Sequence, residues 1–358
     1  MNEGKEYTVI GLMSGTSLDG VDAALCQFRQ TGKGWSYKVI NASTFSYSPK
    51  WKSKLTGAET CLGIDLILLH KEYGDYIGEL VLNFLEKQSI KPDFIASHGH
   101  TIFHQPQKRI TFQLGDGAFI AAKTGITTIS DFRNQDVALN GQGAPLVPIG
   151  DELLFGEYDQ CLNLGGFSNI SFNDKGLRKA FDICPVNIVL NHLMVKCFGQ
   201  EYDNDGNVGR TGNINHHLLE QLNNLAFFKQ PYPKSLGKEW VLDNMIPLIE
   251  ASSIPTEDAL RTVYENIAVQ IAQTTDMLPG TNVLVTGGGA YNLFLMDLIR
   301  SKTTKTITIP DKLIIEFKEA LIFAFLGLLR FLNKPNCLHN VTGAKHDNIG
   351  GVIHMMQD

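Results

Sequence analysis

A glycine-rich turn between two apolar runs, residues 7–28, constrains this sequence of 358 residues more than any other feature. The segment reads YTVIGLMSGTSLDGVDAALCQF, and the runs on either side of the turn predict a β-hairpin. Glycines let a ligand approach the backbone, and turn amides with hydroxyl groups can bind an anion. We therefore predict an anion-binding loop at the hairpin tip, with a hairpin that binds no ligand as the alternative. The candidate residues are Gly15, Thr16, Ser17, Leu18, Asp19, Gly20, Val21 and Asp22.

Two carboxylates, Asp19 and Asp22, follow this turn closely. They would repel a bound polyanion unless a divalent cation lay between them and the anion. Mg²⁺ prefers carboxylate, water and phosphate oxygens, so the pattern predicts a metal nucleotide with Asp19 as the metal ligand.

The segment MSGTSLDGVDAAL resembles the nucleotide-binding opening of the anhydro-N-acetylmuramic acid kinases, a family within the superfamily of sugar kinases, heat-shock ATPases and actin. The resemblance implies an α/β fold of two similar actin-like (ribonuclease H-like) ATPase domains around a nucleotide cleft. Residues 141–148, GQGAPLVP, form a crossover rich in glycine and proline, which suggests a domain boundary. We expect one domain at 1–135, with the C-terminal segment 338–358 packed back on it, and the second at 136–337.

The composition excludes several classes of partner. The net charge of −6 and the lack of a Lys/Arg block argue against nucleic acid. The N-terminus lacks the apolar core of a signal peptide, and the apolar run at 320–332 is too short to span a bilayer, so we expect a cytoplasmic protein that does not bind membranes. Six cysteines without a CxxC pair predict reduced thiols. A homodimer is possible.

Two further glycine turns follow in the second half of the chain. Gly165 and Gly166 separate two predicted strands, 160–164 and 168–172, about 150 residues after the first hairpin, which suggests two similar halves. The third turn leads from a buried strand into a helix, whose N-terminus favours an anion. It lies where actin-like kinases hold adenosine, so the resemblance implies ATP as the nucleotide. Its candidate residues are Gly287, Gly288, Gly289 and Asn292.

Asp182 ends a predicted strand with apolar surroundings, where a carboxyl group can have the raised pKa that a general base uses. The alternative is a helix N-cap, because Pro185 is suited to the first turn of the following helix. The segment FDICPVN resembles the family segment FDTGPGN, which carries the catalytic base. Ile183, Cys184 and Val186 depart from that pattern.

Four residues are candidates for binding a sugar. His98 follows a predicted strand at 92–97, and His98, His100 and His104 lack a further ligand at zinc-site spacing, so hydrogen bonding or a polar turn is favoured over a metal site. The family usually has glutamine at position 100. The resemblance assigns the DFR segment, with Asp131 and Arg133, to the sugar, and arginine can bind a carboxylate bidentately. Glu319 either reaches the sugar or stabilises a helix dipole.

The resemblance runs from residue 7 to residue 344 and implies an ATP- and Mg²⁺-dependent kinase acting on an amino sugar. The family substrate is 1,6-anhydro-N-acetylmuramic acid, whose anhydro bridge is opened while O6 is phosphorylated, in peptidoglycan recycling. Two alternatives stay open. The ICPV replacement at 183–186 is compatible with a phosphotransferase for another sugar, and a non-catalytic ATPase would keep the nucleotide loops.

Overall fold

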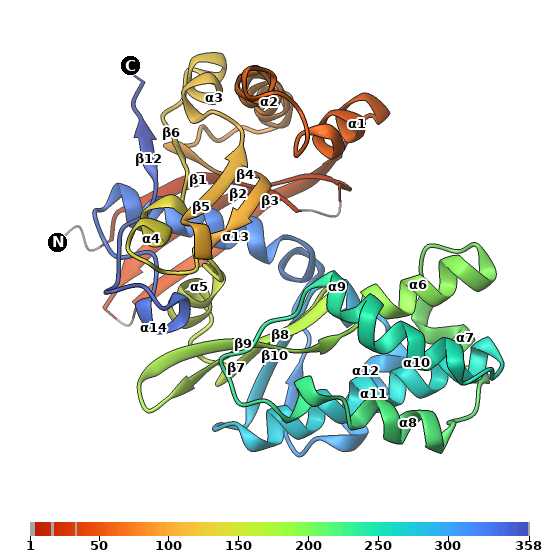
Figure 1. Ribbon diagram of the computed structural model, residues 1–358. Coiled ribbons are helices and arrows are strands. Elements are labelled where there is room, and N and C mark those ends of the chain that lie inside the picture. Colours follow the sequence, from red (N-terminus) through yellow and green to blue (C-terminus); the bar gives the residue numbers. More distant parts are fainter. Residues whose placement is uncertain (1–3, 16–17, 33, 357–358) are drawn as a thin grey trace. The chain divides into compact units, whose positions relative to one another are not determined.

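The computed structural model describes residues 4–15, 18–32 and 34–356, and the chain forms two compact units (Figure 1). The first contains residues 1–155 and 317–358, and the second residues 156–316. These bounds differ from those expected at 135–136 and 337–338. The difference arises because helix α5 (Val147–Leu154) contacts strand β3, and most of helix α13 (Lys312–Phe331) packs on the first sheet.

The first unit is built on a mixed sheet with the strand order β12-β6-β4-β1-β2-β3, and β5 pairs with β4. Strands β1, β2 and β3 form an antiparallel meander, whereas β4 runs parallel to β1 and β6 runs parallel to β4. The opening hairpin is therefore confirmed. The strands are β1 (Glu6–Ser14), β2 (Gly20–Thr31), β3 (Gly34–Ser46), β4 (Phe94–Gln105), β5 (Ile110–Leu114), β6 (Thr128–Ser130) and β12 (Val352–His354).

Helices cover both faces of this sheet (Figure 1). Ile10 and Leu12 of β1 pack in the core that includes α2, whereas Gly11, on the opposite face, lies against α13. On that face Phe94 stacks on Phe331 with ring centroids 4.9 Å apart. The remaining helices of the unit are α1 (Pro49–Gly57), α2 (Gly63–Leu85), η1 (Pro106–Lys108), α3 (Gly117–Thr124), α4 (Asn134–Ala138) and α14 (His339–Thr342).

The C-terminal segment lies on the first unit. Strand β12 pairs antiparallel with β6, and an isolated bridge joins Cys337 to Asn348.

The second unit repeats the strand order of the first. Its sheet is β11-β10-β7-β8-β9, in which β7, β8 and β9 are antiparallel neighbours and β10 and β11 continue parallel to β7. The prediction of an α/β chain with two similarly built domains is confirmed. The strands are β7 (Gln160–Leu164), β8 (Phe167–Asp174), β9 (Leu177–Pro185), β10 (Asn282–Thr286) and β11 (Thr306–Thr308).

One apolar core joins this sheet to its helices. It includes Leu162 of β7, Val283 of β10, Val189 of α6 and Ile267 of α11, all without solvent exposure. The helices are α6 (Asn187–Phe198), η2 (Asn204–Gly206), α7 (Asn207–Thr211), α8 (His216–Asn223), η3 (Ala226–Lys229), α9 (Lys238–Trp240), η4 (Val241–Met245), α10 (Ile246–Ala251), α11 (Thr256–Met277), η5 (Gly288–Tyr291) and α12 (Leu293–Lys302). Within the described ranges, no helix has the length and apolarity needed to cross a membrane.

Two local predictions were wrong in extent. Apolar residues at 51–85 recur at steps of three and four, which predicts a helix. The structure divides this stretch into α1 and α2, because residues 58–62 contain no continuous helix. The strand expected at 92–97 continues to Gln105, because β5 supplies an antiparallel partner for its second half. His98 and His100 therefore lie within a strand rather than beyond its end.

The close contact at Gly11 yields a stability test. A Cβ atom there would lie 1.9 Å from the Ala320 carbonyl oxygen of α13, so Gly11→Ala must displace the helix. We expect a loss of about 1–3 kcal/mol in the free energy of unfolding, as for overpacked cores. Urea denaturation measures it. At Gly63, a Cβ would meet no atom within 4 Å, so Gly63→Ala should be neutral or stabilising; equal losses in both variants would contradict the packing.

Candidate active site

The hairpin tip connects β1 to β2. Thr16 and Ser17 lie outside the described residues, and Gly15 directly follows β1. Gly20 lies against β3, since a Cβ there would approach the Phe45 carbonyl oxygen to 2.4 Å. Leu18 has a left-handed backbone with φ of 61°. Strand β3 thus lies against the end of the hairpin tip and leaves no room for a side chain at position 20, so glycine is required there.

The two hairpin carboxylates have different surroundings. Asp19 is exposed, whereas Asp22 is partly buried and accepts a hydrogen bond from the Thr44 hydroxyl at 2.6 Å. No cluster of three or more His, Cys, Asp or Glu side chains able to hold a metal occurs in the part of the chain that the structure describes. One exposed carboxylate nevertheless fits Mg²⁺, which usually takes one or two protein carboxylates together with water and phosphate oxygens.

Behind the tip lies a buried hydrogen-bond network. The Ser14 hydroxyl is 2.8 Å from His100 Nδ1 and 2.5 Å from the Tyr47 hydroxyl, which in turn bonds to the Tyr73 hydroxyl. Burial lowers the pKa of His100 to about 4, so its ring is neutral at pH 7. The residue at the position where the family usually has glutamine therefore supports the base of the hairpin from within the first unit.

His98 makes a different set of contacts. Its Nδ1 donates to the Gly99 carbonyl oxygen at 2.9 Å, which leaves Nε2 to accept from Arg133 Nε at 3.0 Å. Burial, together with the charge of Arg133, lowers the pKa of His98 well below its usual range. His98 and His100 bond to different side chains, and we expect no shared metal site.

Arg133 is held at two of its nitrogens. Besides the bond from Nε to His98, its Nη1 donates to the Gly143 carbonyl oxygen at 2.6 Å. Burial lowers the pKa of Arg133 to about 10, and the charge of Glu319 opposes that shift. Nη2 donates no hydrogen bond to any of the described residues, so the fixed guanidinium keeps N–H groups for an anion.

Glu319 is the acidic neighbour of this arginine in the first unit. Solvent reaches its side chain, yet surrounding protein displaces enough water to raise the pKa of its carboxyl group, against the opposing charge of Arg133. The alternative role in a helix dipole is weakened, because Glu319 lies in the middle of α13 rather than in its first turn.

A cavity of about 210 Å³ lies beside these residues in the first unit and includes His98 and Asp131 in its wall. Asp131 has a φ of 59°, and its carboxylate accepts from the Asn134 amide at 3.1 Å. Asp116 also reaches the wall, and it caps α3 by accepting a hydrogen bond from the Ala118 N–H. Residues of the wall that no motif singled out are His70, Phe112, Gln113, Gly115, Gly117, Ser130, Asn134, Val352 and His354.

In the second unit, Asp182 lies in β9 near its end. Its backbone N–H donates to the Lys234 carbonyl oxygen at 3.0 Å, and its Oδ2 accepts from the Leu236 N–H at 2.8 Å. Burial raises the pKa of the Asp182 carboxyl group, while the Leu236 hydrogen bond opposes the shift. The N-cap of α6 is Val186, and no side-chain capping bond forms there, so Asp182 is not the cap.

The loop at 231–237 is thus the support of Asp182, and sequence reasoning missed it. Tyr232 stacks on Phe181, the residue before Asp182, with ring centroids 5.1 Å apart. Lys234 Nζ donates to the Phe227 carbonyl oxygen at 3.1 Å, so this lysine anchors the loop. The groups that contact Asp182 are backbone atoms, which leave no signature in residue type.

The three departures from the family pattern lie in the core. Ile183 is 2% exposed, and Cys184 and Val186 are fully buried. The Ser168 hydroxyl donates to the Cys184 carbonyl oxygen at 3.0 Å and so links β8 to β9. Packing therefore accommodates the replaced side chains without placing them at the surface beside Asp182.

The glycine turns of the second unit lie at the same sheet edge as the end of β9, because β7, β9 and β10 run in one direction. The Gly166 carbonyl oxygen accepts from the Val186 N–H at 2.8 Å. A Cβ at Gly287 would lie 2.5 Å from Asn163 Oδ1, and one at Gly289 would lie 2.7 Å from Leu164 Cβ. At Gly288, a Cβ would meet no atom within 4 Å, so this residue leaves the turn open.

Asn292 supports the third turn through both ends of its amide group. Its oxygen caps α12 by accepting from the Leu295 N–H at 2.9 Å, and its nitrogen donates to the Tyr264 hydroxyl at 2.8 Å. The Tyr264 hydroxyl donates to Asp203, whose carboxylate also accepts the N–H groups of Val208 and Gly209. The segment at 201–206, a turn by sequence, is therefore tied to the third glycine turn.

The raised pKa of Asp182 yields a stability test. A carboxyl group whose pKa is higher in the folded than in the unfolded protein stabilises the fold at pH values below its unfolded-state pKa. This contribution is lost as pH rises through the folded-state pKa. Asp182→Asn keeps an oxygen for Leu236 and avoids this loss. We expect the melting temperature of the variant, relative to the parent protein, to increase between about pH 4 and pH 7.

Asp174→Asn serves as the control of opposite sign. The hydrogen bond from Lys179 lowers the pKa of Asp174, so its contribution is present at neutral pH and is lost as pH falls. Its removal should give no relative gain toward pH 7. The same pH trend in both variants would contradict the assigned environment of Asp182.

Comparisons with known proteins give matches over nearly the whole chain. A family model described as anhydro-N-acetylmuramic acid kinase matches residues 7–356. A relative of that description from Hydrogenovibrio crunogenus is 36% identical over 96% of this chain and 97% of its own, and one from Aliivibrio fischeri is 36% identical over 96% and 98%. A solved structure, the activator of the 2-hydroxyisocaproyl-CoA dehydratase from Clostridium difficile with bound ADPNP, has 13% identity and a TM-score of 0.45 over 88% of this chain and 92% of its own. By the family match and these relatives, the chain belongs to the anhydro-N-acetylmuramic acid kinase family.

Proposed function

We propose that the protein is an ATP-dependent kinase that hydrolytically opens 1,6-anhydro-N-acetylmuramic acid and phosphorylates O6. The products are N-acetylmuramic acid 6-phosphate and ADP, and the reaction serves peptidoglycan recycling in the cytoplasm, where ATP is available. Family membership supports the substrate. The structural observation that carries the proposal is Asp182, a partly buried carboxylate with a raised pKa and a single hydrogen-bond donor to its side chain.

Asp182 takes a proton from the water that attacks the anomeric carbon. The bond between that carbon and O6 breaks, O6 keeps the electron pair, and it accepts the γ-phosphoryl group while ADP leaves. The water supplies the new anomeric hydroxyl group and one proton, so the reaction is balanced. A carboxylate with a raised pKa is a stronger base than an ordinary one, which suits it to this step.

Arg133 holds the lactyl carboxylate of the sugar. The bonds to His98 and Gly143 fix the guanidinium plane, and a fixed plane favours the bidentate pairing that carboxylates form with arginine. The neutral His98 orients Arg133 without competing for the anion. Asp131 and Glu319 are acceptors for hydroxyl or amide groups of the sugar, since both carry carboxylates in the same unit.

The glycine turns hold the nucleotide. The segment from Gly15 to Asp22 and the Gly166 N–H offer backbone amides to phosphate oxygens, whereas the Gly165 N–H donates to the Phe167 carbonyl oxygen at 3.1 Å. Gly287 and Gly289 pack on β7, whereas Gly288 leaves room for close approach of adenosine. Asn292 shapes this turn, because both ends of its amide are already bonded within the unit.

Asp19 would hold Mg²⁺, directly or through water. The ion supplies positive charge that neutralises the phosphate oxygens when the nucleotide is bound. Asp22 supports the hairpin through Thr44.

A coupled assay with ATP tests the function directly. The parent protein should phosphorylate 1,6-anhydro-N-acetylmuramic acid and show little turnover of N-acetylmuramic acid or N-acetylglucosamine. Asp182→Asn should lower sugar phosphorylation by roughly 10²- to 10⁴-fold, because it removes the base and keeps the size of the side chain.

The assay should follow the phosphorylated sugar rather than ADP, because water can accept phosphate in a damaged site. Asp174→Asn, at the end of β8, should retain parent activity. A rate for Asp182→Asn within a few-fold of the parent would remove Asp182 as the base, and equal turnover of the other sugars would exclude the proposed substrate.

A further inference from the structure

Asp136, in α4, is a buried carboxylate that the proposed reaction leaves without a role. It is fully buried, and its two oxygens accept four hydrogen bonds. Buried carboxylates usually pair with a cation, but every hydrogen-bond partner of the Asp136 side chain in the described part of the chain is a neutral donor. Charge pairing therefore does not explain why a carboxylate is buried at this position.

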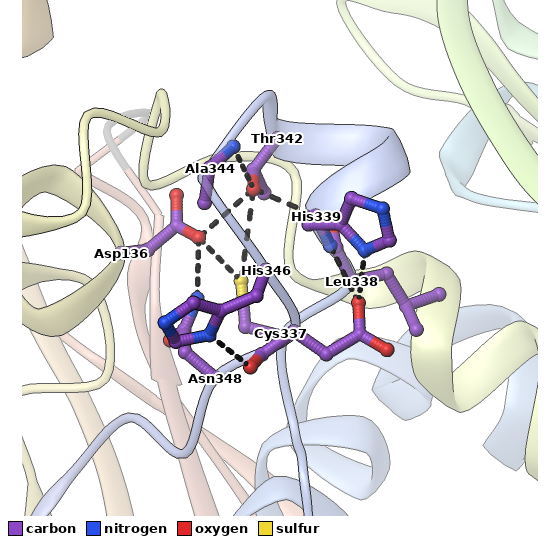
Figure 2. A network of polar contacts seen from close by, with 9 residues as sticks. Asp136, Cys337, Leu338, His339, Thr342, Ala344, His346 and Asn348 are labelled. Atoms are coloured by element: carbon purple, nitrogen blue, oxygen red, sulfur yellow. Dashed lines mark hydrogen bonds and ion pairs between the residues drawn. The ribbon is translucent and has the colours of Figure 1, made fainter.

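One oxygen holds the C-terminal segment. Oδ1 accepts from the Cys337 thiol at 3.0 Å, the Thr342 hydroxyl at 2.8 Å and the Asn348 amide at 2.8 Å, and Figure 2 shows these three side chains converging on it. Burial and the adjacent carboxylate raise the pKa of Cys337, so the sulfur keeps its proton and donates it. Three side chains of the segment 337–348 thus donate hydrogen bonds to the same oxygen, Oδ1 of Asp136.

The other oxygen holds the loop at 141–148. Oδ2 accepts from the Gly143 N–H at 2.8 Å. The loop lies tightly on the carboxylate, because a Cβ at Gly141 would approach Oδ2 to 2.1 Å. Gly143 has a φ of 67°, and a Cβ there would lie 2.7 Å from Val137 Cγ2. The position of Gly143 is therefore determined by Asp136 and α4.

Gly143 also reaches the arginine assigned to the sugar. Its carbonyl oxygen accepts from Arg133 Nη1 at 2.6 Å, while His98 holds Nε of the same side chain. A continuous path thus runs from the C-terminal segment through Asp136 and Gly143 to the guanidinium. Two hydrogen bonds orient Arg133, one to His98 and one to Gly143, and Asp136 determines the position of Gly143.

We propose that Asp136 is a positioning residue for substrate recognition, which orients Arg133 through Gly143 and makes sugar binding depend on the docked C-terminal segment. The proposal rests on the assignment of Arg133 to the sugar carboxylate in the proposed function. Asp136 itself touches no substrate.

The substitution Asp136→Asn distinguishes the two oxygens of Asp136, one of which binds the C-terminal segment and the other Gly143. Asparagine has one acceptor oxygen and a donor NH₂ group in place of the second oxygen. Three donors converge on the Oδ1 position, so the asparagine oxygen should stay there. Its NH₂ group would then face the Gly143 N–H, donor against donor, and displace the loop.

The experiment compares two sugars by calorimetry, 1,6-anhydro-N-acetylmuramic acid and 1,6-anhydro-N-acetylglucosamine, which lacks the lactyl carboxylate. Their affinity ratio in the parent protein reports on recognition of the carboxylate. Arg133→Ala should abolish the preference, and Asp136→Asn should reduce it about tenfold or more, toward the Arg133→Ala value, with unchanged ATP affinity. The control Gly11→Ala destabilises the first unit away from this path, so it should lower the melting temperature and keep the preference.

Two contrary outcomes are distinguishable. If Arg133→Ala loses the preference and Asp136→Asn keeps it within twofold, Asp136 is only structural and the inference fails. If Arg133→Ala keeps the preference, the assignment of Arg133 fails, and the inference with it. If Asp136→Asn is not recovered folded, Gly143→Ala displaces the same carbonyl group from the loop side, and a retained preference in that variant overturns the inference.

Discussion

A polar side chain that leaves water must replace its lost hydrogen bonds, and this constraint shapes both units of the protein. Arg133 is held by His98 and by the Gly143 carbonyl oxygen, and Asp182 is held by the Leu236 N–H. In each unit at least one partner, Gly143 or Leu236, lies in a loop. The loops are therefore part of the site, because they hold the functional groups in place.

Two acids of the structure, the buried Asp136 and the partly buried Asp182, illustrate opposite uses of this constraint. Asp136 has four donors around its carboxylate and serves as a fixed point. Asp182 has one donor to its carboxylate, and burial raises the pKa of its carboxyl group. An acid with few partners retains basicity, whereas a saturated acid holds its neighbours in position. This difference supports the separate roles proposed for the two residues.

Much of the fold follows from local patterns in the sequence. The hairpin around Gly15, the strand before Gly165 and the helix starting at Thr256 are all present, since each has a clear apolar period and a turn at its end. The end of β4 was not predictable in this way, because its second half depends on pairing with β5. The domain bounds also depend on α13, whose fit against Gly11 is a tertiary contact.

The proposed site residues Arg133 and Asp182 could be named from the sequence, because their residue types carry the proposed chemistry. The site was not predictable where a backbone group does the work. The Leu236 N–H and the Gly143 carbonyl group belong to residues of no particular chemical type, and Asp136 looks like an ordinary helix residue in the sequence. His100 was left open for a similar reason, since only the fold brings Ser14 and Tyr47 together beside it.

The most direct test of the proposed chemistry is the origin of the new anomeric oxygen. The reaction should be run in H₂¹⁸O with ATP and 1,6-anhydro-N-acetylmuramic acid, and the product examined promptly by ¹³C NMR and mass spectrometry. Attack of water at the anomeric carbon predicts ¹⁸O on that carbon and none in the bridge between C6 and phosphorus. Label in the C6–O–P bridge, or none at the anomeric carbon, would contradict the account.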